Sequence, residues 1–174
     1  MFGCCNTFFP STCRCNPYSC GGLPPTPSPF PPITPKPSAQ LRGMQLSLVG
    51  SSAGSVGNGD CVAFDTINAN NTLGVSYKAG SGIITLNSTG TYLVNWWIAI
   101  ENAQSAESLA FALSLNGGDV QTSYSDIGGG QIYGTAIVTV NSISSTLSLV
   151  NRSGEAVTLV TAAGQGGLTL TQLA

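Results

Sequence analysis

The sequence predicts an all-β domain built as a two-sheet sandwich, and three observations lead to this prediction. From residue 39 onward, short segments of alternating apolar and polar residues are separated by Gly and Asn. That region keeps no sustained 3.6-residue apolar period of the kind a helix shows, and it contains no proline. About ten such segments are enough to build two packed sheets.

The segment 91–100 is the strand around which we expect the domain to be organised. It holds both tryptophans and contains no Gly, Pro or charged residue. Alternate side chains of a strand share a face, so the core face would carry Tyr92, Val94, Trp96, Ile98 and Ile100. The opposite face carries Leu93, Trp97 and Ala99 around Asn95. Because this second face is also mostly apolar, we expect another layer or another subunit to cover it.

The other strands are expected where the same alternation recurs along the chain. The predicted segments are 44–49, 61–64, 74–77, 83–86, 92–100, 109–115, 120–124, 132–140, 146–151, 156–161 and 168–173. Leucine and phenylalanine alternate strictly in 109–115, and Asn116-Gly117-Gly118 follows, which predicts a hairpin. The glycines at 128–130 lack the lysine and the strand-to-helix context of a phosphate loop, so they indicate a connection.

Composition divides the chain into a Cys-rich N-terminal connector (1–22), a Pro-rich extended linker (23–38) and the sandwich domain (39–174). All ten prolines lie between Pro10 and Pro37. Proline fixes φ and removes backbone donors, so the linker favours a polyproline II rod, which would reach roughly 50 Å. A disordered linker or a ligand for proline-reading modules remains the alternative. The two N-terminal segments together form the arm.

The cysteines predict disulfides more than a metal site. Five of them lie in the arm and one in the domain: Cys4, Cys5, Cys13, Cys15, Cys20 and Cys61. The spacing fits zinc poorly, and the chain has no histidine. If Val62 and Phe64 face the core, Cys61 faces outward. We therefore expect Cys4 or Cys5 to crosslink to Cys61 of another copy, the alternative being a half-buried free thiol. The candidate subunit-interface residues are Leu93, Trp97, Phe30 and Ile33.

Charge and hydropathy argue against several partners. Charged residues make up 7% of the chain and the net charge is −2, with no basic stripe to neutralise phosphates, so no nucleic acid is expected. No apolar run reaches the ~18 residues of a membrane helix, so no membrane is expected. The start of the chain lacks the basic and apolar regions of a classical signal peptide. Weak net charge also permits self-association.

The side chains offer little for catalysis, so we expect no enzyme, no cofactor and no metal. Without histidine there is no Ser-His or Cys-His nucleophile and no usual catalytic zinc set. Two acid pairs, Glu101 with Glu107 and Asp119 with Asp126, are more typical of solvated surface groups than of a glycosidase site. A further pair, Asp60 and Asp65, is too small a ligand set for calcium.

A series of short motifs resembles the jelly rolls of the complement and tumour-necrosis-factor type. The series consists of Val62-Ala63-Phe64-Asp65, Asn70-Asn71, Tyr77, Gly82-Ile83-Ile84 and Gly90-Thr91-Tyr92-Leu93-Val94. Leu113 to Gly117, Ser144 to Val150, Gly154 and the closing segment 167–174 continue in the family's order. The resemblance implies a jelly-roll sandwich that assembles as a homotrimer.

Within that group the domain is similar to the C-terminal domains of collagen-like glycoproteins of the bacterial spore surface, the exosporium. It departs from them because no Gly-X-Y repeat precedes the domain. The cysteine-bearing arm resembles the connector of bacterial endospore appendage subunits. Together these resemblances imply a structural subunit of an extracellular spore-surface fibre, in which trimers stack head to tail through docked arms and inter-subunit disulfides. A spore-surface anchoring protein would be a further partner. The alternative is a terminal adhesive or ligand-binding module displayed on a proline-rich stalk.

Overall fold

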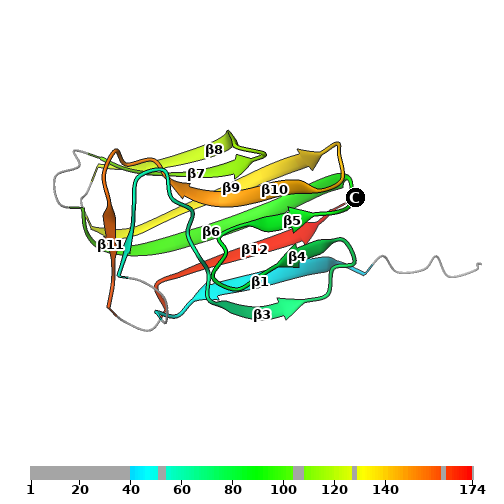
Figure 1. Cartoon of the computed structure of the whole chain (residues 1–174), viewed down its shortest axis with the longest axis horizontal. Helices are drawn as coiled ribbons and strands as arrows, with labels where there is room; N and C mark the ends of the chain where they lie inside the picture. Colours follow the sequence, from blue (N-terminus) through cyan, green and yellow to red (C-terminus); the bar gives the residue numbers. More distant parts are fainter. Residues whose placement is uncertain (1–39, 51–53, 104–107, 127–128, 162–163, 174) are drawn as a thin grey trace, which may run out of the picture. The chain divides into compact units, whose positions relative to one another are not determined.

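The computed structural model describes residues 40–50, 54–103, 108–126, 129–161 and 164–173. These residues form twelve β-strands in two antiparallel sheets, and no helix occurs among them (Figure 1). The predicted all-β, two-sheet jelly-roll class is confirmed. None of the described segments is a helix that could cross a bilayer. The arm and the boundary at residue 38 lie outside the described residues, so those assignments stay predictions.

The first sheet is built around β6 (Gly90–Ala103), the longest strand. One edge of β6 pairs with β9 (Gly130–Val140), and the other pairs with β12 (Gly166–Gln172) and then with β11 (Val157–Leu159). Beyond β12 lie β1 (Arg42–Leu48) and the edge strand β3 (Thr66–Asn70), while β2 (Ser55–Val56) pairs with β11. Figure 1 shows β6, β12 and β1 side by side in this layer.

The second sheet has five strands in the order β4-β5-β10-β7-β8. Their bounds are Val75–Tyr77, Ile84–Leu86, Ser145–Asn151, Leu109–Leu115 and Gly118–Ser125. The predicted hairpin joins β7 to β8, where Asn116 and Gly117 have φ values of 52° and 83°. Positive φ at both positions suits a tight turn whose twist matches that of the flanking strands, and Asn-Gly is the favoured pair there.

The core lies between the sheets and follows the alternation read from the sequence. The five side chains predicted for the core face of β6 are all buried, with exposed fractions of 2% or less. Trp96 packs against Phe111 of β7, with ring centroids 6.4 Å apart. Its Nε1 donates a hydrogen bond to Oε1 of Gln121 on β8 (3.1 Å), so the polar end of the indole is satisfied inside the sandwich.

The strand pattern differs from the prediction at three places. The segment 61–64 is not a strand: it makes one isolated bridge, between Cys61 and Val150, although Val62 and Phe64 are buried as the alternation predicted. The strands β2 and β3 were not predicted. Only two residues form β2, and all but the first residue of β3 are exposed, so neither carries a strong apolar alternation.

Candidate functional site: the outward face of the first sheet

Twelve outward-facing residues of β1, β12, β6 and β9 form one continuous surface, which we call the β6 face. The strand registers place these side chains in three rows across the strands. The aromatic row is Ser47, Gly167, Trp97 and Tyr133; the polar row is Gln45, Thr169, Asn95 and Thr135; the aliphatic row is Gly43, Thr171, Leu93 and Ile137. None of these twelve residues carries a charge.

The aromatic row is shaped by a glycine. A methyl group at Gly167 would place its carbon 2.7 Å from Nε1 of Trp97, so the indole lies across β12 only because Gly167 has no side chain. The neighbouring Gly166 faces the core, where a methyl carbon would lie 2.7 Å from Cδ1 of Ile98. The Gly166-Gly167 pair thus makes room for the core on one side and for Trp97 on the other. Beside Trp97, Tyr133 is 73% exposed.

The other two rows differ in chemistry although they lie next to each other. In the aliphatic row Leu93 is partly exposed and Ile137, its partner on β9, is 69% exposed, so the two apolar side chains adjoin on the surface. In the polar row the Thr135 hydroxyl donates a hydrogen bond to Oδ1 of Asn95 (2.8 Å). Among the described residues, the side chains of Gln45 and Thr169 have no hydrogen-bond partner.

A cleft of about 480 Å³ opens on the β6 face where the aromatic and polar rows meet. Its walls include Gln45, Asn95, Trp97, Tyr133 and Thr169. Such a mixture of aromatic, amide and hydroxyl groups can bury surface and form hydrogen bonds. This chemistry is suited to contact with another protein surface.

The structure places the sequence-predicted interface residues as follows. Leu93 and Trp97 both lie on the β6 face, at strand positions opposite Ile137 and Tyr133. Sequence reasoning did not identify these two partners, because apolar residues occupy both faces of β9. The other interface candidates, Phe30 and Ile33, lie outside the described residues. The assignment of Leu93 and Trp97 to a subunit interface stays a prediction.

Cys61 lies away from this surface, in a cleft of about 340 Å³ whose walls include Leu48, Asp60, Ser81 and Leu159. Its side chain is partly exposed, and within the described residues it has no disulfide partner. A methyl group at Gly82 would come 2.7 Å from Cβ of Cys61, so the close approach of these two segments depends on the glycine. The five arm cysteines lie outside the described residues, and the predicted crosslink stays a prediction.

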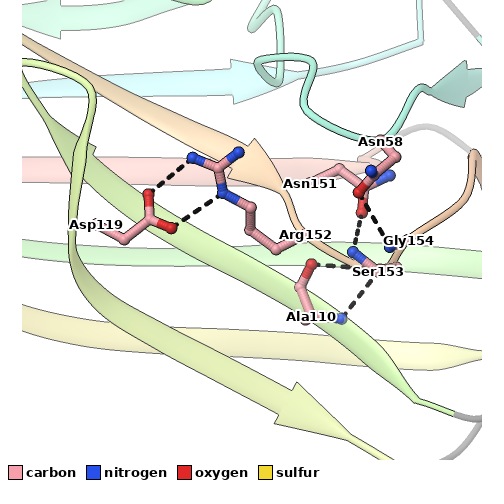
Figure 2. Close-up of polar contacts among 7 residues, drawn as sticks. All are labelled: Asn58, Ala110, Asp119, Asn151, Arg152, Ser153 and Gly154. Atoms are coloured by element: carbon pink, nitrogen blue, oxygen red, sulfur yellow. Dashed lines mark hydrogen bonds and ion pairs between the residues drawn. The ribbon is translucent and has the colours of Figure 1, made fainter.

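Two of the described acidic residues that were considered as catalytic or metal-binding groups, Asp119 and Asp65, have other partners. Asp119 forms an ion pair with Arg152, with Nε 3.0 Å from Oδ2 and Nη2 3.0 Å from Oδ1 (Figure 2). The hydrogen bond from the guanidinium lowers the pKa of Asp119. Glu107 is not described, and both oxygens of Asp65 accept a hydrogen bond from the backbone N–H of Val49. In the described ranges, no three His, Cys, Asp or Glu side chains gather as metal ligands would.

A buried amide organises the loops at the end of β10. Asn151 is fully buried, and its Nδ2 donates to the carbonyl oxygens of Val56 (2.9 Å) and Glu155 (2.8 Å). Its Oδ1 accepts the backbone N–H of Ser153 (2.9 Å), as Figure 2 shows. The side-chain amide therefore uses both hydrogens and its oxygen. Asn151 begins an Asn-X-Ser sequon, yet in the folded domain its amide cannot accept a glycan.

The fold has relatives among solved structures, although no family model and no curated protein matches the sequence. The domain superposes on murine APRIL (TM-score 0.59, 11% identity, covering 77% of this chain and 100% of that one). It also superposes on Eiger, a TNF from S. frugiperda (TM-score 0.55, 14% identity, covering 77% of this chain and 93% of that one). A third match is the globular domain of zebrafish complement 1qA (TM-score 0.53, 10% identity, covering 75% of this chain and 94% of that one). The described domain therefore has a jelly-roll fold of the TNF and C1q type.

Proposed function

We propose that this chain is a structural, self-associating subunit whose jelly rolls assemble as homotrimers through the β6 face. In this proposal the N-terminal arms link one trimer to the next through disulfides, so that the trimers form a fibre on an extracellular surface such as that of a bacterial spore. The protein has no catalytic role. Jelly rolls of the TNF and C1q type are typically homotrimers, which fits the first step.

The observation that carries the proposal is the combination of apolar exposure and absence of charge on the β6 face. Leu93, Trp97, Tyr133 and Ile137 present apolar surface that an isolated domain would leave in water. A surface without charge does not repel an identical surface, and it offers no salt-bridge partner to a strongly charged protein. A second copy of the same chain is thus the partner that this surface suits.

The fibre step rests on the arm and on Cys61. A contact between the arm of one copy and the domain of another joins two different surfaces, and such contacts propagate when they do not close into a ring. Cys61 lies in an open cleft, which supports its role as the acceptor of an arm cysteine. The spore surface as the location comes from the sequence resemblance, and it is part of the proposal.

A matched pair of substitutions tests the trimer. Ile137 on the β6 face is 69% exposed, and Ile143, in the connection between β9 and β10, is 68% exposed. We expect Ile137→Glu to convert the reduced protein from trimers to monomers, because the change would bury a carboxylate in each copy. Ile143→Glu should leave the trimer intact. Sedimentation velocity measures both, and a trimer that survives Ile137→Glu would overturn the β6 face as the interface.

Electron microscopy of the purified full chain, with and without reductant, tests the fibre. We expect fibres under oxidising conditions and separate trimers after reduction. Discrete trimers under oxidising conditions would contradict the fibre and would support the alternative, an adhesive module displayed on the proline-rich linker.

A further inference from the structure

We infer that the polar row of the β6 face determines the register in which copies of the domain meet. This inference deepens the proposed function and rests on it. The polar row lies between two apolar rows, with Leu93 and Ile137 on one side and Trp97 and Tyr133 on the other. Neighbouring rows are two residues apart along each strand, which is about 6.8 Å.

Within one copy, several hydrogen-bonding groups of the polar row have no partner among the described residues. The Oδ1 atom of Asn95 already accepts the Thr135 hydroxyl, whereas no described residue accepts a hydrogen bond from Nδ2 of Asn95. The side chains of Gln45 and Thr169 likewise find no partner within the described part of the domain. Water satisfies these groups in an isolated domain. Another copy must satisfy them once it covers the face.

The cost of leaving these groups unpaired makes the interface selective. A buried polar group without a hydrogen bond loses its hydration with nothing to replace it, and each copy would bury several such groups. When the rows of two copies meet at the same height, the amide of Asn95 meets hydroxyl and amide groups. When the copies slip by one row, it meets either the aliphatic or the aromatic row. The slipped arrangements are therefore penalised, although they would bury similar apolar area.

The physical precedent is the buried asparagine of a coiled coil, which fixes register and oligomeric state at a cost in stability. The same trade predicts the effect of replacing Asn95 with an apolar side chain. The association becomes stronger, because no amide has to be desolvated. It also becomes less specific, because slipped and aligned arrangements then have similar free energies.

The experiment compares the reduced full-length protein with its Asn95→Leu variant by sedimentation and by the number of indole N–H signals in a ¹H-¹⁵N spectrum. The chain has two tryptophans, so one symmetric register gives two indole signals. We expect two signals and one oligomeric mass for the natural sequence. For Asn95→Leu we expect additional indole signals or several masses, and dissociation at about tenfold lower concentration.

Two further variants make the result specific to the polar row. Thr169→Val removes a hydroxyl within the row, and it should likewise give additional indole signals or several oligomeric masses. Thr139→Val makes the same chemical change on an exposed β9 residue outside the three rows, and it should retain two signals and one mass.

The possible failures are distinguishable. If Asn95→Leu keeps one mass and two indole signals, shape alone sets the register and the inference is wrong, while the trimer stands. If the natural sequence is monomeric at all concentrations, both the trimer and the inference fail.

Discussion

The indole of Trp97 lies across Gly167, and a single methyl group at that glycine would come within 2.7 Å of the indole nitrogen. This contact joins the two central strands of the β6 face, β6 and β12. Because Trp97 is only partly buried, its indole can swing outward if the glycine gains a side chain. A change in the position of the Trp97 indole should therefore alter the β6 face and leave the packing of the core largely unchanged.

A pair of adjacent alanine substitutions should separate the surface from the core. Gly167→Ala should change the free energy of unfolding by less than about 1 kcal/mol while weakening self-association about tenfold, because it displaces the indole. Gly166→Ala should lower the free energy of unfolding by about 1–3 kcal/mol, because the new carbon meets Cδ1 of Ile98 and lies 3.0 Å from the Trp97 carbonyl oxygen. Urea unfolding and sedimentation equilibrium measure the two effects, and the reverse pattern would contradict this assignment.

Removal of the Asn151 side chain should be among the most destabilising polar substitutions in the domain. Asn151→Ala leaves the carbonyls of Val56 and Glu155 and the amide of Ser153 without their partner. We expect a loss of about 3 kcal/mol in the free energy of unfolding, measured in urea. The exposed Asn87, which also begins a sequon, provides the control, and Asn87→Ala should change stability by less than about 0.5 kcal/mol.

The phenol of Tyr77 should make the domain sensitive to alkaline pH. Its hydroxyl donates to the carbonyl oxygen of Phe64 (2.7 Å), and burial raises the pKa of Tyr77 above the ordinary value of 10.0. A raised folded pKa means that the stabilisation is complete below the unfolded value and is lost as the pH rises through the folded value. Tyr77→Phe should cost about 1 kcal/mol at neutral pH. The difference from the natural sequence should shrink at high pH, and a constant difference would exclude this cause.

The ion pair between Asp119 and Arg152 should contribute little, and only above acidic pH. The guanidinium lowers the pKa of Asp119 from its ordinary value of 3.8. The contribution of the ion pair to the free energy of unfolding is therefore complete above the ordinary pKa of 3.8, and it is lost as the pH falls through the lower folded pKa. The two side chains are 33% and 38% exposed, so solvent screening limits the effect of Asp119→Asn to less than about 1 kcal/mol. Urea unfolding should show this difference at neutral pH, and the difference should shrink as the pH falls below 3.8.

Covalent linkage between copies should depend on Cys61. On nonreducing gels the natural protein should give a ladder of covalent oligomers, and Cys61→Ser should remove or shorten it, because the cleft at Cys61 admits a thiol from outside. Sedimentation of the reduced variant provides the control, since a serine there should leave the noncovalent trimer unchanged. An unaltered ladder would show that the arm cysteines pair only among themselves.

The sequence predicted most of the fold because the apolar alternation is local. Trp96 and Trp97 were assigned to opposite faces from period 2 alone, and the structure places Trp96 in the core and Trp97 outside it. The hairpin at Asn116 and Gly117 followed from turn chemistry. The alternation failed at β3, an exposed edge strand, and in the segment 61–64, where residues alternate in burial without forming a ladder.

The surface could be predicted only in part, because it depends on register between distant segments. Trp97 was identified as an outward residue, but its contact with Gly167 joins residues seventy positions apart along the chain. The opposition of Leu93 to Ile137 likewise follows from the pairing of β6 with β9, which no local pattern encodes. The ion pair of Asp119 with Arg152 is another such case.

The first and last strands of the domain are antiparallel neighbours, with Arg42 opposite Gln172. A fluorescent protein or affinity tag fused after residue 173 would therefore emerge beside Arg42, at the start of β1. Labels intended to report on assembly belong at the opposite end of the two sheets, near Gly154, where they would leave the start of β1 and the end of β12 clear.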